Sequence, residues 1–446
     1  MGAETILIWN GLLVAAGAIG GVYAAVHLGR WIDHAWPPIP SSPLDVFFGV
    51  LNGTVPWPPA STGVLVAIVA LALVLAAVAA VITRPARRRR TRVDRAAAFM
   101  GRGRDVREQA RPAATRKAKA LGVGATGVPI GLTVNGRRRL FGTWEDMHVD
   151  IWGPRTGKTT SRAVPAILDA PGAVLVTSNK RDVVDATRDV RAAGGPVWVF
   201  DPQGITLEEP TWWWNPLSYV TDEVKAAKLA EHFAAGSRDP GARTDAYFDP
   251  AGQDLLAGLL LAAALDKRPI TDVYLWLTRP KNDDAVSILG AHGYTLTADQ
   301  VAGVISAPEK QRGGVYGTAQ QMAGCLTNRS IARWVNPQRA LDTRPQFDPE
   351  AFVRAGAGTL YSLSKEGRGT AGPLVTALTV AVVEAAEDLA ARSPRGRLPT
   401  PLLGVLDEAA NVCRWRELPN LYSHYGSRGI VLMTILQSWS QGTEVW

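Results

Sequence analysis

The residues best placed to do chemistry form a short loop rich in glycine. It reads Trp152-Gly153-Pro154-Arg155-Thr156-Gly157-Lys158-Thr159-Thr160. Glycines let the backbone curl so that several N–H groups face one anion, and a helix that starts at the end of the loop adds its positive end. We therefore predict that residues 153–160 bind the phosphates of ATP, with Lys158 on the β- and γ-phosphates and Thr159 on Mg²⁺. The alternative is an ordinary glycine turn.

The spacing of this loop is irregular. Three residues separate Gly153 from Gly157, where the common phosphate-loop pattern has four. Trp152 stands in the place of the first glycine, and Pro154 has no N–H to donate. The sequence therefore raises the question whether Trp152 can replace glycine without displacing Lys158.

Two acids supply the other half of the predicted site. Asp407 and Glu408 directly follow the apolar run 402–406. Ligands bind at the carboxyl ends of strands in open α/β sheets, so these acids should face the nucleotide. We expect Asp407 to hold Mg²⁺ through its water shell and Glu408 to orient and deprotonate the attacking water.

Two further polar residues flank the apolar run 430–436. Gln437 follows it, and its amide is predicted either to sense the γ-phosphate or only to cap backbone groups. Arg428 precedes it in Ser427-Arg428-Gly429, which we interpret as a turn. Arg428 is predicted to act as an arginine finger in a neighbouring subunit, with a solvated turn arginine as the alternative.

The elements that position these residues alternate between strand and helix. Short apolar runs are expected to be strands at 149–152, 173–177, 197–200, 359–363, 402–406 and 430–436. Helices are expected at 159–168, with Pro165 as a kink, at 180–193 and at 373–391. This order predicts an α/β P-loop NTPase fold, RecA-like, with a mainly parallel sheet flanked by helices. The ATPase domain then covers 122–221 and 336–446, and the helical runs of 222–335 form an all-α insertion domain.

The N-terminal part is predicted to anchor the chain in a membrane. Two apolar segments, about 5–28 and 63–82, are each long enough to span a bilayer within an anchor of residues 1–83. Arginines cluster directly after the second segment, which places the ATPase domain and the N-terminus in the cytoplasm and leaves a short external loop. A signal peptide is the alternative for the first segment. Trp31, Trp36 and Trp57 are expected to lie at the membrane interface.

Residues 84–121 form a basic linker. Between Arg84 and Lys119 there are 14 Lys and Arg against three Asp and Glu, an excess larger than the net charge of +8 of all 446 residues. The linker is predicted to bind anionic lipid, with nucleic-acid phosphates as the alternative ligand. The two cysteines, Cys325 and Cys413, exclude a disulfide scaffold and lack the spacing of a metal site, so we interpret them as reduced core thiols.

Taken in order, these motifs resemble the TraG/TraD family of type IV coupling proteins, which belong to the FtsK/HerA group of motor ATPases. The resemblance rests on two spans, the phosphate loop, Phe200-Asp201-Pro202, Asn215-Pro216-Leu217, Leu406-Asp407-Glu408, Leu418-Pro419, Arg428-Gly429 and Gln437-Ser438. It implies a homo-hexamer in the cell membrane that uses ATP to move single-stranded DNA with bound relaxase towards the membrane proteins of a secretion channel. It also implies that the insertion 222–335 receives substrate.

The family usually continues beyond the position of Trp446, so the chain is expected to be a fragment whose sheet lacks its last strand and helix. Other functions stay open. The same ATPase core would suit a protein-export or chromosome-segregation motor. A receptor that binds ATP without hydrolysing it is the alternative that involves no catalysis, although the Asp407-Glu408 pair argues against it because simple binding needs no general base.

Overall fold

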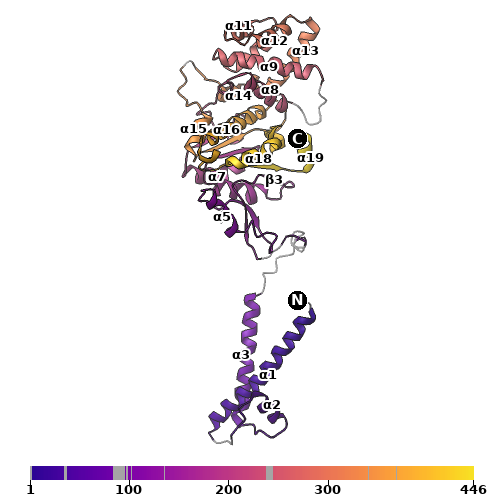
Figure 1. The fold of residues 1–446 in the computed structure, drawn as a ribbon, viewed down its shortest axis with the longest axis vertical. Helices are drawn as coiled ribbons and strands as arrows, with labels where there is room; N and C mark the ends of the chain where they lie inside the picture. Colours follow the sequence, from indigo (N-terminus) through magenta and orange to yellow (C-terminus); the bar gives the residue numbers. More distant parts are fainter. Residues whose placement is uncertain are drawn as a thin grey trace. The chain divides into compact units, whose positions relative to one another are not determined.

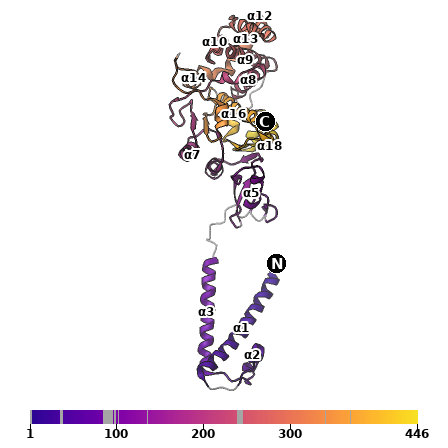
Figure 2. The same cartoon turned by 60° about the vertical axis from the view of Figure 1, so that its left-hand side comes forward.

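The computed structural model describes residues 3–34, 38–83, 96, 99–101, 103–134, 136–237, 245–339, 341–367 and 369–446. They belong to two compact units, Met1–Ala98 and Phe99–Trp446, and each is described by itself. Figures 1 and 2 show the elements of both units from two directions.

The first unit is a helical hairpin. Helices α1 (Ala3–Asp33) and α3 (Pro59–Thr83) pack against each other, and the short helix α2 (Pro43–Leu51) lies beside α1 in the connection. The hairpin closes where Gly29 meets Ser61, because a Cβ on Gly29 would lie only 2.7 Å from the Ser61 backbone nitrogen. The Asp33 carboxylate then accepts a hydrogen bond of 2.9 Å from the Ala60 amide and so caps the start of α3.

Two helices among the described residues are long and apolar enough to cross a membrane. One is residues 59–79 of α3, which agrees with the predicted span at 63–82. The other is α9 (Phe248–Leu265), but half of it is buried, so it is a core helix of the second unit. The span predicted at 5–28 lies within α1, where side chains 3–14 are outside the described residues, and it stays a prediction. The basic linker also lies partly outside them, at 84–95, 97–98 and 102.

The second unit is built around a parallel sheet of six strands in the order β3-β8-β7-β4-β6-β5. The strands are β3 (His148–Ile151), β4 (Val174–Ser178), β5 (Val197–Phe200), β6 (Thr359–Leu363), β7 (Leu402–Leu406) and β8 (Ile430–Leu436). Each agrees within about a residue with a predicted apolar run, and every pairing is parallel. The α/β fold with a mainly parallel sheet is therefore confirmed.

Alternate strand residues enter two separate cores, one on each face of the sheet. On β4, Val174 and Val176 pack with α6 (Val164–Asp169) and α7 (Asp182–Ala192). Leu175 points to the opposite face, into the core that contains α16 (Gly372–Arg392), α17 (Ala409–Val412) and α18 (Leu418–Arg428). Period-two alternation on strands buried on both faces explains the continuous apolar runs in the sequence.

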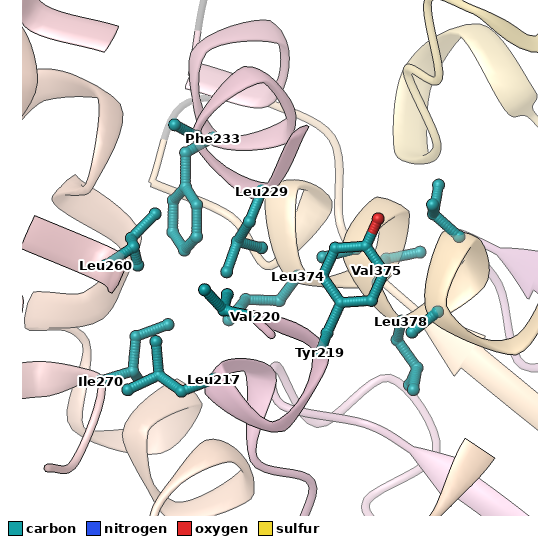
Figure 3. Close-up of a cluster of buried hydrophobic side chains, with 14 of the residues drawn as sticks. Leu217, Tyr219, Val220, Leu229, Phe233, Leu260, Ile270, Leu374, Val375 and Leu378 are labelled. Atoms are coloured by element: carbon teal, nitrogen blue, oxygen red, sulfur yellow. The ribbon is translucent and has the colours of Figure 1, made fainter. Parts of the chain in front are cut away.

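A layer of helices covers α16 and enlarges this second core. It comprises α8 (Glu223–Ser237), α9, α10 (Thr271–Leu277), α11 (Asp284–Ala291), α12 (Thr295–Ser306), α13 (Glu309–Met322) and α14 (Arg329–Val335). Figure 3 shows the junction, where Phe233 and Leu229 of α8 and Leu260 of α9 lie near Leu374 of α16. Cys325 and Cys413 are buried here as free thiols, as predicted, and burial raises the pKa of each to about 12.

The remaining elements border the sheet. A two-stranded antiparallel sheet, β1 (Val128–Leu132) with β2 (Arg139–Gly142), precedes β3, and α5 (Arg111–Ala120) packs against β2. Helix α15 (Pro349–Ala355) precedes β6, and α19 (Trp439–Val445) follows β8. Single turns of 3-10 helix occur at η2 (Pro216–Tyr219), η3 (Gly324–Thr327) and η4 (Pro394–Gly396).

Candidate nucleotide site

The carboxyl ends of β3, β7 and β8 bring the predicted residues together. Lys158 follows β3 through the glycine loop, and its Nζ lies 3.1 Å from Asp407 Oδ1 and forms a short contact with Glu408 Oε1. The three side chains are 12%, 3% and 1% exposed. Two acids and one lysine that are 250 residues apart in the chain thus form one buried charge cluster.

Gln437 completes the cluster from β8, the strand between β3 and β7. Its Nε2 lies 2.8 Å from each carboxylate oxygen of Glu408 and donates to them. Its own backbone N–H donates to Gln441 Oε1 at 3.0 Å, which fixes the strand end. The amide therefore orients the predicted general base directly.

Burial and charge act on this cluster in opposite directions. Burial alone would lower the pKa of Lys158, but its hydrogen bond with Glu408 and the negative charges of both acids outweigh burial and raise the pKa. Burial raises the pKa of the Asp407 carboxyl, and the attraction of Lys158 offsets this only in part. Asp407 Oδ1 is buried, and among the described residues its charge is compensated by Lys158.

Glu408 has a strained backbone. Its φ of 55° and ψ of 40° place it in the left-handed region, which non-glycine residues rarely adopt. Such conformations cost about 1–3 kcal/mol and persist only where the surrounding structure fixes them, often at functional sites. The carbonyl of Glu408 accepts hydrogen bonds from Asn411 and Val412, which start α17 and hold this turn.

The backbone of the glycine loop shows how Trp152 can stand in the place of the first glycine. The Trp152 amide donates to the Leu436 carbonyl at 2.9 Å, so Trp152 extends the pairing of β3 with β8 and has no positive φ. The left-handed positions are instead Arg155, with φ 58°, and Gly157, with φ 87°. A tryptophan is therefore compatible with the place of the first glycine, because that place is extended backbone here.

The helix predicted at 159–168 is present, but its first part is not α-helical. Thr159–Ala163 (η1) is π-helical and continues without a break into α6, which covers Val164–Asp169 and contains Pro165. The π-helical turn directly before Pro165 is thus the local distortion of this helix, where a kink was predicted.

A buried ion pair joins the two sides of the glycine loop. Arg162 is only 2% exposed, and its Nε lies 3.0 Å from each carboxylate oxygen of Asp150 on β3. Its Nη1 also donates to the Pro129 carbonyl of β1. Sequence analysis missed this pair, although an acid within an otherwise apolar strand was its visible signal.

Arg428 does not lie on a turn, and this prediction is wrong. It is the last residue of α18, which Gly429 ends with a φ of 78°, as glycine commonly ends a helix. Its Nε donates to His424 at 3.1 Å. Arg428 precedes β8 (Ile430–Leu436) and so lies at the amino-terminal ends of the parallel strands, whereas Lys158 lies at their carboxyl ends. The structure therefore does not bring Arg428 and Lys158 together within one chain.

Asp201 and Asn215, from the two motifs between the phosphate loop and the acids, make local hydrogen bonds that stabilise the backbone. Asp201 is buried and accepts hydrogen bonds of 2.7 Å from the amides of Ile205 and Thr206, which folds the loop after β5. Asn215 caps η2 by accepting from the Leu217 amide at 3.1 Å. These hydrogen bonds shape the loop after β5 and the start of η2, and among the described residues neither side chain is hydrogen-bonded to Lys158 or Glu408.

The donor set fits a nucleotide with Mg²⁺. A buried aspartate oxygen that contacts only Lys158 among the described residues suits a hydrated hard cation, and Thr159 adjoins Lys158 at the start of η1. Residues 153–156 are exposed, and Gly157 through Thr159 are half-buried. Among the described residues no group of three or more His, Cys, Asp or Glu is placed to hold a metal ion.

The same elements carry a family match. Residues 401–446, which contain β7, β8, Asp407, Glu408 and Gln437, match the family model described as the TraM recognition site of TraD and TraG. The resemblance to TraG and TraD is confirmed. No curated protein matches the chain in sequence.

Solved structures similar to this chain include several of one conjugative coupling protein. A bacterial conjugative coupling protein, TrwBdeltaN70, in an unbound form is 17% identical over 71% of this chain and 67% of its own, with a TM-score of 0.48. The plasmid coupling protein TrwB with ADP and Mg²⁺ is 16% identical over 71% and 69%, again with a TM-score of 0.48. TrwB with a non-hydrolysable ATP analogue gives the same values. The chain spans about two thirds of the length of these structures.

Proposed function

We propose that this chain is a membrane-anchored ATPase that couples ATP hydrolysis to the transport of DNA in conjugation. The observation that carries the proposal is the buried cluster of Lys158, Asp407, Glu408 and Gln437, which assembles a phosphate-binding lysine, a cation ligand, a base and an orienting amide. The match of residues 401–446 to TraD and TraG supports the choice of DNA as the transported substrate.

Each residue has a defined task in this proposal. Lys158 leaves the two carboxylates and neutralises the phosphates. Residues 153–160, apart from Pro154, surround the phosphates with backbone N–H groups, and Thr159 and Asp407 would hold Mg²⁺. The cation supplies charge neutralisation on the phosphoryl oxygens. Glu408, oriented by Gln437, accepts the proton of the attacking water.

The proposal extends to the assembly and its partners. Two spans place the ATPase on the cytoplasmic side of the cell membrane, and the basic linker contacts anionic lipid. The chain forms a hexamer. Arg428 lies at the amino-terminal ends of the strands, away from the nucleotide site of its own chain, and so acts as an arginine finger only on a neighbouring subunit. The TraM-recognition match suggests a protein partner of that kind beside DNA with bound relaxase and the secretion-channel proteins.

The test is phosphate release by the full chain in lipid nanodiscs. We expect hydrolysis of ATP that rises when single-stranded DNA is added and that is lost in Lys158→Ala. Lys310→Ala, which changes an exposed lysine of the helical layer, serves as the matched control and should keep the basal rate. Nucleotide binding without any phosphate release would contradict the proposal and favour a receptor that only binds ATP.

A further inference from the structure

A glutamate outside the predicted site joins three segments at the same edge of the sheet. Glu366 lies in the loop 364–371, which follows β6. Its Oε1 accepts hydrogen bonds from Asn179 Nδ2 at 2.5 Å and from Asn411 Nδ2 at 2.8 Å. Asn179 follows β4 and Asn411 lies in α17, so one carboxylate oxygen connects the ends of β6, β4 and β7.

The two asparagines flank Glu408. The backbone N–H of Asn411 donates to the backbone carbonyl of Glu408 at 2.8 Å, within the turn that gives Glu408 its left-handed backbone. On the other side, Thr177 and Leu406 are the last paired residues of β4 and β7, and Asn179 and Glu408 each lie two residues beyond this pair. Movement of either asparagine would therefore act on the segment that carries the base.

The residues on either side of Glu366 are held from the neighbouring strand β5, which pairs with β6 at the edge of the sheet. Gln203, which follows β5 at the outer edge of the sheet, accepts hydrogen bonds through Oε1 from Ser364 Oγ at 3.0 Å, Lys365 N at 2.9 Å and Ala371 N at 3.1 Å. These bonds fix both ends of the loop 364–371. A single amide oxygen thus sets the position from which Glu366 reaches the asparagines.

Asn179 carries a second observation. Its Oδ1 is buried and has no hydrogen-bond partner among the described residues, whereas buried polar atoms are nearly always paired. Because Glu366 engages the nitrogen of this amide, the oxygen is left as an acceptor on the strand next to β7. Such an acceptor suits a water molecule beside the general base.

From these contacts we propose that Glu366 is a positioning residue for hydrolysis, which acts on Glu408 through Asn179 and Asn411. The role rests on the proposed ATPase function. A left-handed glutamate keeps its geometry only if its surroundings enforce it, and Glu366 supplies that restraint from the loop 364–371. Loss of the restraint lowers the rate of the chemical step and leaves nucleotide binding intact, because the hydrogen bonds of the described residues connect the two asparagines to Glu366 and to the turn at Glu408, and not to Lys158 or the glycine loop.

The test compares two substitutions at Glu366 in the full chain. For Glu366→Ala we expect kcat for ATP to fall roughly tenfold, with KM and the nucleotide Kd unchanged, as for groups that orient a catalytic residue. Glu366→Gln keeps an oxygen that can accept both amide bonds, so it should retain most of the wild-type kcat. Glu350→Ala, which removes an exposed carboxylate paired with Arg354 on α15, is the matched control.

A second variant removes the side chain of Gln203, which follows the edge strand β5. Gln203→Ala releases the loop and should reproduce the kinetic signature of Glu366→Ala, namely a lower kcat at constant KM. Full turnover in Glu366→Ala, or equal losses in Glu366→Ala and Glu366→Gln, overturns this role while the ATPase function stands. A wild-type chain that releases no phosphate overturns the proposed function and this role with it.

Discussion

The amide of Gln437 donates to both carboxylate oxygens of Glu408, at 2.8 Å each. A side-chain amide that holds both oxygens fixes the rotation of the carboxylate as well as its position. The same carboxylate contacts Lys158, so the proposed base, the proposed phosphate-binding lysine and the amide form one network, which we expect nucleotide to rearrange when it binds.

Removing the amide should therefore affect chemistry more than binding. In Gln437→Ala, Glu408 keeps its ion pair but loses its orientation, and we expect kcat for ATP to fall roughly 10- to 100-fold with little change in KM. Steady-state phosphate release measures this. Gln300→Ala, an exposed amide on α12, is the control, and an equal loss in both variants would show that the effect is not specific to the site.

The ion pair across the glycine loop should matter for stability. Asp150→Ala leaves Arg162 buried without its partner, and removing one member of a buried pair costs about 3–5 kcal/mol of unfolding free energy. Denaturant titration measures the loss. Glu350→Ala breaks the exposed pair with Arg354 and should cost below about 1 kcal/mol.

A compensating double substitution separates stability from function. Asp150→Leu with Arg162→Met replaces the pair by apolar side chains and should recover much of the unfolding free energy. If the pair also shapes the glycine loop, nucleotide affinity should stay reduced in the recovered protein. Full recovery of affinity would limit the pair to a role in stability.

A buried histidine should make the fold sensitive to acid. Burial, with the charge of Lys228 adding to it, lowers the pKa of His232 to about 3. Below pH 6.5 the unfolded chain binds a proton that the folded chain refuses, so stability is lost as pH falls from about 6.5 towards 3. His232→Leu should reduce the slope of unfolding free energy against pH by about 1.4 kcal/mol per unit in this range.

The comparison with the wild type contains its own control. Above about pH 7.5, His232 is neutral in both states, so the two curves should run parallel there. Identical slopes between pH 4 and 6 would contradict the assignment of this acid sensitivity to His232. The measurement is denaturant titration of both proteins across the pH range.

Much of the sheet could be predicted because its strands are buried on both faces. Runs such as 402–406 and 430–436 are continuously apolar and flanked by polar or turn residues, which is the local signature of parallel strands. The phosphate loop and the pair Asp407-Glu408 were also visible, since each stands at the end of such a run. The local pattern of apolar residues, and the position of polar residues at the ends of the apolar runs, were sufficient to predict the strands, the phosphate loop and the acid pair.

The contacts that could not be predicted from the sequence depend on the order of the strands in the sheet and on loops that are far apart in the chain. The insertion of β8 between β3 and β7 is what brings Gln437 to Glu408, and no local pattern encodes it. Glu366 sits in a polar loop that reads as an ordinary connection, and only the folded sheet places it against Asn179 and Asn411. The prediction for Arg428 failed because a glycine after a helix looks like a glycine in a free turn.

Glu408→Gln provides the most direct test of the account. The variant keeps the size of the side chain and one oxygen that can accept from Gln437, but it removes the base. Phosphate release by the full chain should be stimulated by single-stranded DNA in the wild type and fall by roughly 10²- to 10⁴-fold in the variant, while the Kd for ATP changes little. Wild-type turnover in Glu408→Gln, or a wild-type chain that binds ATP and releases no phosphate, would contradict the assignment of this cluster as a hydrolytic site.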